Sequence, residues 1–440
     1  MKHYRLEGGG CVSGRLAMPG DKSISHRALL LSGIAEGASR ITGFLASEDC
    51  LATLAALQAL GVRIERPQPR EVLVQGSGPS ALHRAAAPLD MGNSGTAMRL
   101  FMGLLAGCPF DSTLVGDASL MRRPMERVAT PLRLMGAQLA TVAGRPPVHI
   151  AAWSDALRAI EYELPVASAQ VKSAILLAAL GARGRTRITE PAPTRDHTER
   201  MLARFGAEVL RSGSQVALEG GQVLRGTRIA VPGDFSSAAF FLVAGCLAAR
   251  GTLVLENVGL NPTRTGLLEL LRQMGADIRT HPVAGAMEDA GGEPVADIEV
   301  RASVLHGIKV SEALVPLAID EFPVFFIAAA CAQGETLVRG ALELRVKESD
   351  RLAVMAEGLR TLGIEHELLP DGLWIRGGGA FRGGTLESHG DHRIAMAFAV
   401  ASLRAGAPLE IRDVANVATS FPAFVATARA AGLRITEYGS

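Results

Sequence analysis

The chain is poor in cysteine, in aromatic residues and in long apolar stretches. Among its 440 residues are five cysteines, and the three aromatic residue types together make up 4%. The cysteines stand apart, at positions 11, 50, 108, 246 and 331, without a CxxC pair or a histidine cluster. This pattern is typical of reduced thiols rather than of a disulfide framework or a zinc site. We therefore expect a cytoplasmic protein that holds no metal.

Charge and hydropathy exclude two further classes of protein. The 45 basic and 44 acidic residues leave a net charge of +1, so no bulk attraction to nucleic acid or to an anionic membrane is expected. The longest apolar stretches, such as Ala238–Ala249 and Val324–Ala332, are too short to span a bilayer. The first ten residues are polar and glycine-rich, which predicts no signal peptide. A local cationic site for a small anion remains compatible with this composition.

The chain is rich instead in a repeated pattern. A glycine between two apolar residues follows a helical segment six times, at positions 61, 136, 206, 275, 363 and 432. A polar turn that opens an apolar helix also occurs six times, at 19–27, 92–99, 167–172, 232–237, 320–323 and 390–395. Glycine is favoured just beyond a helix because it adopts the left-handed backbone conformation. The two patterns recur in order, which predicts one structural unit present in six copies.

The order of elements within one copy predicts an α/β fold. In the first copy we expect helices at 21–36 and 48–60, with Ser23 or Ser25 as the N-cap of the first, and strands at 39–44, 62–66, 71–75 and 87–90. The unit is therefore βαβαββ. The helices at 174–180, 238–248 and 394–403 are apolar nearly all round and should be buried. Three units on each side of 225–232 indicate two similar domains, and we expect 281–294 to be a surface hairpin or loop inserted in the fifth unit.

Polar and cationic side chains gather where these helices begin. One group opens the apolar helices: Lys22, Ser23, Arg27, Asn93, Ser94, Thr96, Ser168 and Gln170. A second opens the other helices: Arg122, Arg123, Arg195, Lys347 and Arg351. A helix N-terminus attracts anions, so cations there indicate a bound anion that compensates them. Lys347 and Arg351, four residues apart, are expected on one helical face. The alternative is a solvated charged face with Glu348 and Asp350 as local partners.

Acids accompany these cations, and other motifs are less informative. Asp320 opens an apolar helix, and Glu348 follows Lys347. A carboxylate among cations can act as a base, and one buried by a bound substrate can act as an acid; the residues alone leave both roles open. The turn at 19–23 lacks the GxxxxGK frame of a phosphate-binding loop. His197 and His392 lie beside acids at helix starts, which indicates capping or orientation rather than metal ligation.

In sequence the chain resembles the 5-enolpyruvylshikimate-3-phosphate (EPSP) synthases, over essentially its whole length. The motifs that carry the resemblance are PGDKSISHR (19–27), GNSGTAMR (92–99), RRP (122–124), SAQVK (168–172), RDHTE (195–199), NPTRTG (261–266), IDEFP (319–323), LRVKESDRL (344–352), GDHRIAM (390–396) and ATSFP (418–422). They are similar to those of the class II branch. The resemblance implies two inside-out α/β domains, residues 1–20 with 233–440 and residues 21–232, with the active site in the cleft between them.

The resemblance also implies roles for individual residues. The shikimate 3-phosphate site would comprise Lys22, Ser23, Arg27, Ser168, the backbone N–H of Ala169, Gln170, Arg195, Asp320 and Lys347. The phosphoenolpyruvate site would comprise Lys22, Asn93, Gly95, Arg123, Gln170, Arg351 and Arg393. Arginine suits these roles because its planar fork meets two anionic oxygens at once. Both substrates are anionic, so a nearly neutral chain needs this concentration of cations.

The implied reaction joins shikimate 3-phosphate to phosphoenolpyruvate by addition and then elimination of phosphate. Asp320, alone or with Lys22, would remove the proton of the attacking 5-hydroxyl group. Glu348 would deliver a proton to the methylene carbon. No metal or organic cofactor is needed. The family implies a monomer whose partners are these small molecules, with no nucleic acid and no membrane.

Two positions bear on how far this chain follows the family pattern, and two other functions are alternatives to the predicted one. Thr419 stands where many class I members have a lysine, so one cation of the phosphoenolpyruvate site is missing. Gly95 is retained where tolerant members carry alanine, which predicts inhibition by glyphosate. The UDP-N-acetylglucosamine enolpyruvyl transferases use a reactive cysteine in the loop that is Gly116–Pro124 here, and this loop has none. A non-catalytic phosphate-binding protein would not need Asp320 and Glu348 among the cations.

Overall fold

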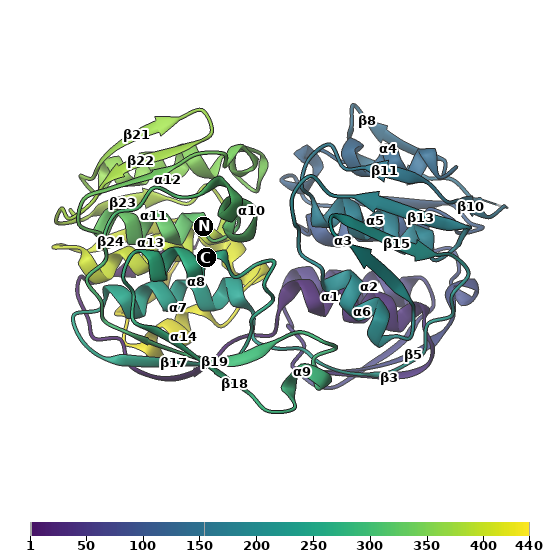
Figure 1. The fold of residues 1–440 in the computed structure, drawn as a ribbon, viewed down its shortest axis with the longest axis horizontal. Coiled ribbons are helices and arrows are strands. Elements are labelled where there is room, and N and C mark those ends of the chain that lie inside the picture. Colours follow the sequence, from purple (N-terminus) through teal and green to yellow (C-terminus); the bar gives the residue numbers. More distant parts are fainter. Residues whose placement is uncertain (1, 154, 440) are drawn as a thin grey trace. The chain divides into compact units, whose positions relative to one another are not determined.

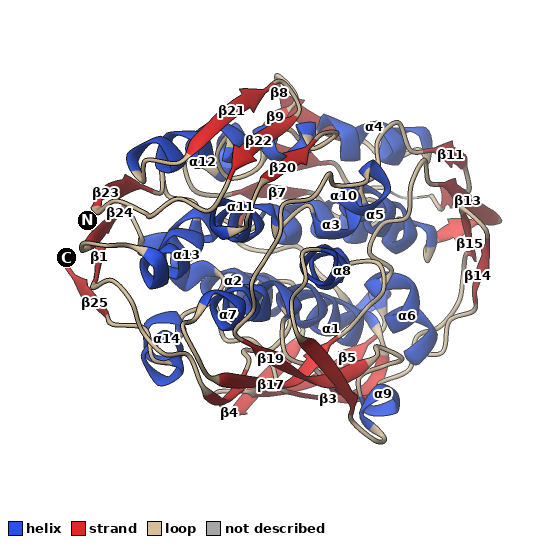
Figure 2. Cartoon of the chain, turned by 60° about the vertical axis from the view of Figure 1, so that its left-hand side comes forward, coloured by secondary structure: helices blue, strands red, loops and turns tan. Residues whose placement is uncertain are grey.

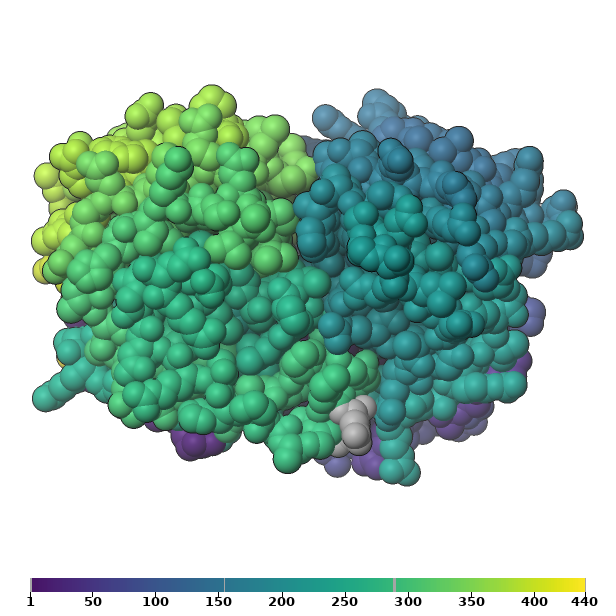
Figure 3. Space-filling model, viewed as in Figure 1, coloured from purple at the N-terminus to yellow at the C-terminus, as the bar shows by residue number. Residues whose placement is uncertain are grey.

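The computed structural model describes residues 2–153 and 155–439, and these residues form two compact units (Figure 1). Unit 1 contains the described residues of Met1–Pro19, Pro232–Ala284 and Pro294–Ser440, and unit 2 contains Gly20–Val231 and Gly285–Glu293. Figure 3 colours the surface of both units by residue number. The observed division differs from the expected one mainly in residues 285–293. They belong to unit 2, although the chain segments directly before and after them belong to unit 1.

The sheets of unit 2 repeat one strand order. In each, the first strand is parallel to the second, and the second, third and fourth are antiparallel. The orders are β16-β3-β5-β4, β6-β7-β9-β8 and β11-β13-β15-β14. The bounds are β3 Glu36–Thr42, β4 Arg63–Gln68, β5 Glu71–Ser77, β6 Leu89–Asp90, β7 Ser112–Val115, β8 Leu139–Val142, β9 Arg145–Ile150, β11 Glu161–Glu163, β13 Arg185–Thr189, β14 Val209–Ser212, β15 Gln215–Glu219 and β16 Arg228–Ala230, beside a short pair of β10 Leu157–Arg158 and β12 Ala182–Arg183.

The sheets of unit 1 follow the same order. They are β23-β24-β1-β25, the sheet of β2, β17, β19 and β18, and the three-stranded β20-β22-β21. In the last, parallel bridges from His306 and Lys309 take the place of a fourth strand. The bounds are β1 His3–Leu6, β2 Gly14–Ala17, β17 Thr252–Gly259, β18 Ile278–Pro282, β19 Val295–Arg301, β20 Glu335–Val338, β21 Glu365–Leu369, β22 Gly372–Arg376, β23 Gly384–Glu387, β24 Leu409–Arg412 and β25 Ile435–Tyr438. Six sheets of one topology confirm the six-copy repeat.

Two strands lie in sheets that the order of the repeat would not suggest. Strand β2 precedes the first apolar helix, which belongs to unit 2, yet it pairs in parallel with β17 of unit 1. Strand β16 precedes the fourth apolar helix, which belongs to unit 1, yet it pairs in parallel with β3 of unit 2. The first and fourth copies have therefore exchanged their leading strands.

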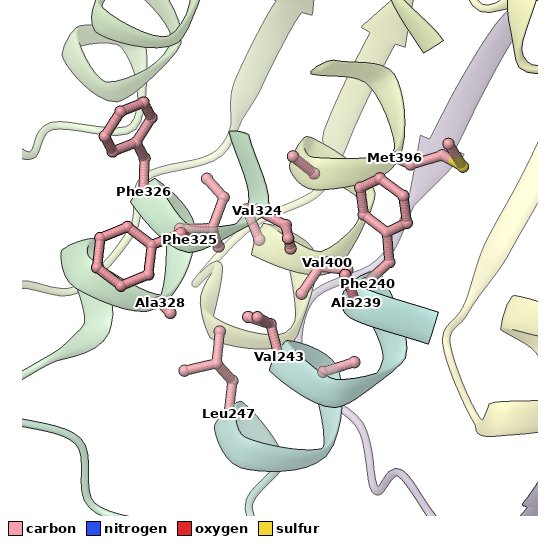
Figure 4. Close-up of a cluster of buried hydrophobic side chains, with 14 of the residues drawn as sticks. Ala239, Phe240, Val243, Leu247, Val324, Phe325, Phe326, Ala328, Met396 and Val400 are labelled. Carbon is pink, nitrogen blue, oxygen red and sulfur yellow. The ribbon is translucent and has the colours of Figure 1, made fainter. Parts of the chain in front are cut away.

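The apolar helices form the core of each unit, and the sheets lie outside them (Figure 2). They are α1 Lys22–Ile34, α3 Gly95–Leu105 and α5 Ala169–Ala179 in unit 2, and α7 Phe235–Leu247, α11 Phe322–Cys331 and α13 His392–Ala401 in unit 1. Figure 4 shows how Val243 of α7, Phe325 of α11 and Val400 of α13 gather in one buried cluster. Burial of such side chains stabilises a fold by about 1.5–3 kcal/mol each. The prediction that these helices are buried is confirmed.

The second helix of each copy ends at a glycine. These helices are α2 Glu48–Ala59, α4 Glu126–Leu134, α6 His197–Arg204, α8 Gly266–Gln273, α12 Arg351–Thr361 and α14 Phe424–Ala431. The six glycines of the repeat have φ from +78° to +109°, a backbone conformation that strongly favours glycine. Short helices complete the structure: α9 Ala286–Asp289, α10 Val315–Ala318 and the 3₁₀ turns Pro79–Ala81, Leu120–Arg122, Glu312–Leu314, Leu342–Val346, Ser402–Arg404 and Ala415–Thr419.

Two local predictions are wrong. The N-cap of α1 is Asp21, whose Oδ1 accepts a hydrogen bond of 2.9 Å from the Ile24 N–H, whereas Ser23 and Ser25 lie within the helix. The insertion at 281–294 lies between β18 and β19, hence in the fourth copy rather than the fifth. It is not a simple surface hairpin either, because Gly285–Glu293 packs with unit 2.

Candidate active site

The start of α1 carries the first predicted site residues, Lys22, Ser23 and Arg27. Lys22 is half-buried and forms an ion pair with the carboxylate of Asp49 from α2. One turn later, Arg27 donates a hydrogen bond of 2.9 Å to the carbonyl oxygen of Ser23. Ser23 and Arg27, four residues apart, therefore lie on one face of α1, and Lys22 lies beside Ser23 in the first turn, where the unpaired backbone N–H groups also lie.

The Arg27 guanidinium is buried and links three helices. Its Nε donates to Thr198 Oγ1 of α6 over 2.7 Å, and its Nη2 donates to Ser173 Oγ of α5 over 2.9 Å. Burial lowers the pKa of Arg27 to about 10, although nearby carboxylates act in the opposite direction. Arg195 is half-buried, two residues before α6 begins. The starts of α1, α5 and α6 thus contribute to one cationic region of unit 2.

A second group surrounds Gly95, the first residue of α3. A methyl group added at Gly95 would lie 3.1 Å from an Arg99 nitrogen and 3.2 Å from an Arg123 nitrogen. Arg99 also donates to the side-chain oxygen of Gln170, whose nitrogen donates to Thr96 Oγ1 over 2.9 Å. The side chains of Arg99, Arg123 and Gln170 therefore gather around position 95, and glycine is the residue type that leaves room for them there.

The turn before α3 holds Arg123 in place. Asn93 accepts a hydrogen bond of 2.7 Å from Arg123 Nη2 and donates one of 2.6 Å to Asp117. Ser94 caps α3, and His26 lies between Ser94 and Thr53. Burial, followed by the charges of two neighbouring cations, holds the pKa of His26 well below its ordinary value, so the ring is neutral at pH 7. In α5, Ser168 is the N-cap and Ala169 the first residue, beside Gln170.

The remaining predicted residues form one cluster in unit 1, centred on Asp320. The Oδ1 atom of Asp320 lies 3.2 Å from Lys347 Nζ and 3.4 Å from an Arg351 nitrogen. Arg393 donates a hydrogen bond of 3.0 Å to the backbone carbonyl of Asp320. The structure thus brings together a carboxylate and three cations that are up to 73 residues apart in the sequence.

Arg351 is the most buried member of this cluster. It bonds Glu348 over 2.6 Å and Asp391 over 2.8 Å, with 1% of its side chain exposed. Burial alone would lower the pKa of Arg351, but the carboxylates around it outweigh burial and raise that pKa. Burial likewise raises the pKa of Asp391, and Arg351 outweighs this effect, so the net shift is downward.

The unit 1 cluster corrects one expectation and argues against one alternative. Lys347 and Arg351 do not share a helical face, because Lys347 ends the 3₁₀ turn at 342–346 and α12 begins at Arg351. Nor is Arg351 part of a solvated charged surface, since its charge is matched inside the protein. Asp320 lies just before α11 rather than within it, with Glu321 at the N-cap position.

Sequence reasoning missed several polar residues that hold the predicted ones. Asp49 and Arg99 do so in unit 2. In unit 1, Asp391 bonds Arg351, and Ser236 links Arg264 to Glu321, which lies 3.5 Å from Arg393. Arg99, Arg264 and Asp391 stand inside quoted motifs, so a signal for them existed. Nothing in the repeat distinguishes Asp49 from an ordinary first-turn acid of α2.

Position 419 carries no cation in the structure either. The Thr419 hydroxyl donates to the backbone carbonyl of Asn416 over 2.8 Å. Within residues 2–153 and 155–439, no group of three or more histidine, cysteine or acidic side chains is placed to bind a metal ion. Over the same residues, no helix is long and apolar enough to cross a membrane.

Comparison with known proteins agrees with this geometry. The family model for EPSP synthase (3-phosphoshikimate 1-carboxyvinyltransferase) matches residues 6–427. The 3-phosphoshikimate 1-carboxyvinyltransferase of Methylococcus capsulatus is 58% identical over 97% of this chain and 97% of its own, and that of Alkalilimnicola ehrlichii is 58% identical over 99% and 96%. The solved EPSP synthase of Acinetobacter baumannii is 52% identical, covers 100% of both chains and has a TM-score of 0.89. The motifs, the six-copy fold and these matches together show that the chain belongs to the EPSP synthase family.

Proposed function

We propose that this chain transfers the enolpyruvyl group of phosphoenolpyruvate to the 5-hydroxyl of shikimate 3-phosphate, with release of phosphate. The observation that carries the proposal is the unit 1 cluster, where two carboxylates, Asp320 and Glu348, lie among Lys347, Arg351 and Arg393. A site for an anion alone needs the cations. Acids at these positions add groups that can move protons.

Shikimate 3-phosphate would be bound by the starts of α1, α5 and α6 together with two residues of unit 1. Lys22, Arg27 and Arg195 supply charge, while Ser23, Ser168, Gln170 and the Ala169 N–H supply hydrogen bonds; Asp320 and Lys347 complete the set. Helix N-termini stabilise phosphate through unpaired N–H groups and the helix dipole. Lys22 and Arg195 are half-buried rather than fully buried, which supports this assignment.

Phosphoenolpyruvate would be bound beside Gly95. Arg123 and Gln170 converge there with the Asn93 turn, and Lys22, Arg351 and Arg393 would provide further cations. Neither unit holds a complete set for both substrates. We therefore propose that residues of both units act on the two substrates together.

The proposed proton transfers follow from the contacts of the two acids. Asp320, with Lys22 as a second candidate, accepts the proton of the 5-hydroxyl as that oxygen attacks carbon 2 of phosphoenolpyruvate. Glu348 donates a proton to the methylene carbon, which becomes a methyl group, and the tetrahedral intermediate then loses phosphate while Glu348 takes back a methyl proton, so the enolpyruvyl double bond is restored. In the structure, Glu348 is bonded to Arg351 over 2.6 Å. An anionic group of the substrate that binds Arg351 would replace this bond and release Glu348 for proton transfer.

The test is to mix the protein with both substrates and to measure phosphate release and the enolpyruvyl product. Turnover that requires both substrates supports the proposal, whereas binding without turnover contradicts it. Asp320→Ala should lose most turnover with little change in phosphoenolpyruvate binding. Glu357→Gln is the matched control, because Glu357 is an exposed acid of α12 that pairs with a surface histidine.

UDP-N-acetylglucosamine as the acceptor is the second candidate, and the structure disfavours it. That reaction relies on a reactive cysteine, but Gly116–Pro124 contains none. Burial raises the pKa of Cys108, the nearest in sequence, to about 11, which makes it a poor nucleophile. Turnover with this acceptor and none with shikimate 3-phosphate would reverse the assignment.

We also propose a cytoplasmic monomer that requires no cofactor and binds neither nucleic acid nor membranes. All five cysteines are free thiols, as expected in a reducing compartment. Light scattering after size-exclusion chromatography tests the oligomeric state, and turnover after dialysis against a chelator tests the need for a metal.

A further inference from the structure

Residues Gly285–Glu293, which we name the strap, leave one unit and pack with the other. The chain departs from unit 1 after Ala284 and returns to it at Pro294. The flanking strands β18 and β19 remain paired in the unit 1 sheet, with His281 opposite Asp297 and Pro282 opposite Ala296. Helix α9, marked in Figure 1, lies in the strap. A hairpin that served only to join two strands would not need this excursion.

The strap is fixed to helix α6 by close backbone contacts. Arg200 of α6 donates a hydrogen bond of 2.7 Å to the carbonyl oxygen of Gly292. A methyl group added at Gly291 would lie 3.5 Å from the Arg204 side chain, also of α6. Gly291 and Gly292 have φ of +69° and +87°, so two successive residues adopt the conformation that glycine favours. These contacts place the next residue, Glu293, at the start of α6.

Glu293 forms a buried pair with His197, the first residue of α6. Glu293 Oε1 lies 2.6 Å from His197 Nδ1, and both side chains are 1% exposed. When Glu293 is ionised it only accepts hydrogen bonds, and Nδ1–H of His197 is then the donor. Asp196, at the N-cap position, bonds Arg200 and Arg211 and does not cap the helix with its side chain. The strap therefore supplies a carboxylate that orients the first turn of α6.

That first turn carries groups assigned to shikimate 3-phosphate. Arg195 lies two residues before His197, and Thr198 follows it and accepts the hydrogen bond of 2.7 Å from Arg27. Glu293 is also among the charges that act on Arg27. A shift of His197 would displace Arg195 and the Arg27 partner together.

We propose that Glu293 is a positioning residue for the binding of shikimate 3-phosphate, acting through His197 on Arg195 and Thr198. The inference rests on the proposed function, because it takes the cations of this region to bind that substrate. It does not extend to phosphoenolpyruvate, whose residues around Gly95 lie on other helices. Glu293 would therefore affect the two substrates unequally.

The test is the affinity of the full-length protein for each substrate, measured by calorimetry and by steady-state kinetics. Glu293→Ala should weaken binding of shikimate 3-phosphate about tenfold to a hundredfold, the range expected if the displaced Arg195 loses one hydrogen bond to the phosphate. The KM for phosphoenolpyruvate and kcat should change less than about threefold. Glu293→Gln keeps the volume and an acceptor oxygen, so it should restore most of the affinity and remain folded.

A double-mutant cycle identifies the route of the effect. If Glu293 acts through His197, Glu293→Ala should add little in a His197→Asn background. Glu219→Gln is the control, because Glu219 forms an exposed pair with Arg185 in the same unit. Equal losses of affinity for both substrates, or unchanged affinity for shikimate 3-phosphate in both Glu293 variants, would overturn the inference. If the wild-type protein still turns over both substrates, the proposed function stands in either case. Absence of wild-type turnover would instead overturn the proposed function, and the inference with it.

Discussion

Replacement of Lys172 by methionine tests whether the buried charges beneath the unit 2 site are balanced. The Lys172 side chain is 0% exposed, and its Nζ lies 3.0 Å from Glu190 and 2.7 Å from Glu199. Glu199 belongs to the first turn of α6, and Lys172 belongs to α5. Methionine keeps much of the volume but removes the charge that both carboxylates face.

The expected loss follows from burial of the two acids. Their side chains are 5% and 2% exposed, so neither can regain its hydration when Lys172 is absent. Removal of one partner from a buried ion pair costs about 3–5 kcal/mol. A change of 1 kcal/mol shifts Tm by about 2–4 °C for a unit of this size, so we expect a decrease of about 6–20 °C. Calorimetry of the purified protein would resolve such a shift.

Two further variants decide whether charge balance is the cause. Lys309→Met alters an exposed lysine and should leave Tm unchanged. Lys172→Met combined with Glu190→Gln removes one charge of each sign and should recover part of the loss, because Glu199 is then the one carboxylate that has lost its Lys172 partner. A Tm decrease below about 2 °C for Lys172→Met, or no recovery in the double variant, would refute the reasoning.

Three other changes give expected outcomes. Gly95→Ala places a methyl group 3.2 Å from Arg123, so KM for phosphoenolpyruvate should rise about tenfold and inhibition by glyphosate should weaken; equal effects on shikimate 3-phosphate would contradict this. The lowered pKa of Asp391 means that its pair with Arg351 stabilises the fold above the ordinary pKa of about 3.9 and is lost as pH falls through the lower native pKa. In acid, the unfolding free energy of the wild-type protein should therefore approach that of the Asp391→Asn variant. A difference between the two unfolding free energies that does not change with pH would contradict this prediction. Glu348→Gln should lower kcat about 10²–10⁴-fold in single-turnover assays with near-normal substrate binding, and near-normal kcat would exclude Glu348 as the acid.

Sequence periodicity predicts most of the fold because the repeat rests on local physics. A left-handed residue after a helix favours glycine, and a helix buried on all sides favours apolar residues at most of its positions. Both signals survive in all six copies. The exchange of β2 and β16 leaves no such signal, since each strand has the same pattern and length whichever sheet it joins. Pairing partners far apart in the chain are fixed by tertiary packing, which periodicity does not encode.

The sequence predicts those residues of the candidate site that lie at the starts of helices. Lys22, Asp320 and Arg351 all stand at or just before helix starts, where charge has an electrostatic meaning. The residues that hold them are different in kind. Asp49 is one of many acids in a first helical turn, and Glu293 lies in a segment that periodicity marks only as an insertion. Their importance comes from the partner that each meets, and the identity of that partner is a property of the fold.

The strand exchange gives the two chain crossings a direct relation to the site. Apart from the crossings at either end of the strap, these are Pro19–Gly20 and Val231–Pro232, and each leads within a few residues into an apolar helix, to Lys22 of α1 and to Ser236 of α7. In unit 1 the Asp234 N–H donates to the carbonyl of Pro19 over 2.8 Å, so the two crossings lie together. Ser236 bonds Glu321, which pairs with Arg393. A change in backbone geometry at Pro19–Gly20 would therefore act next to Lys22, and one at Val231–Pro232 would act on Arg393 through Ser236 and Glu321.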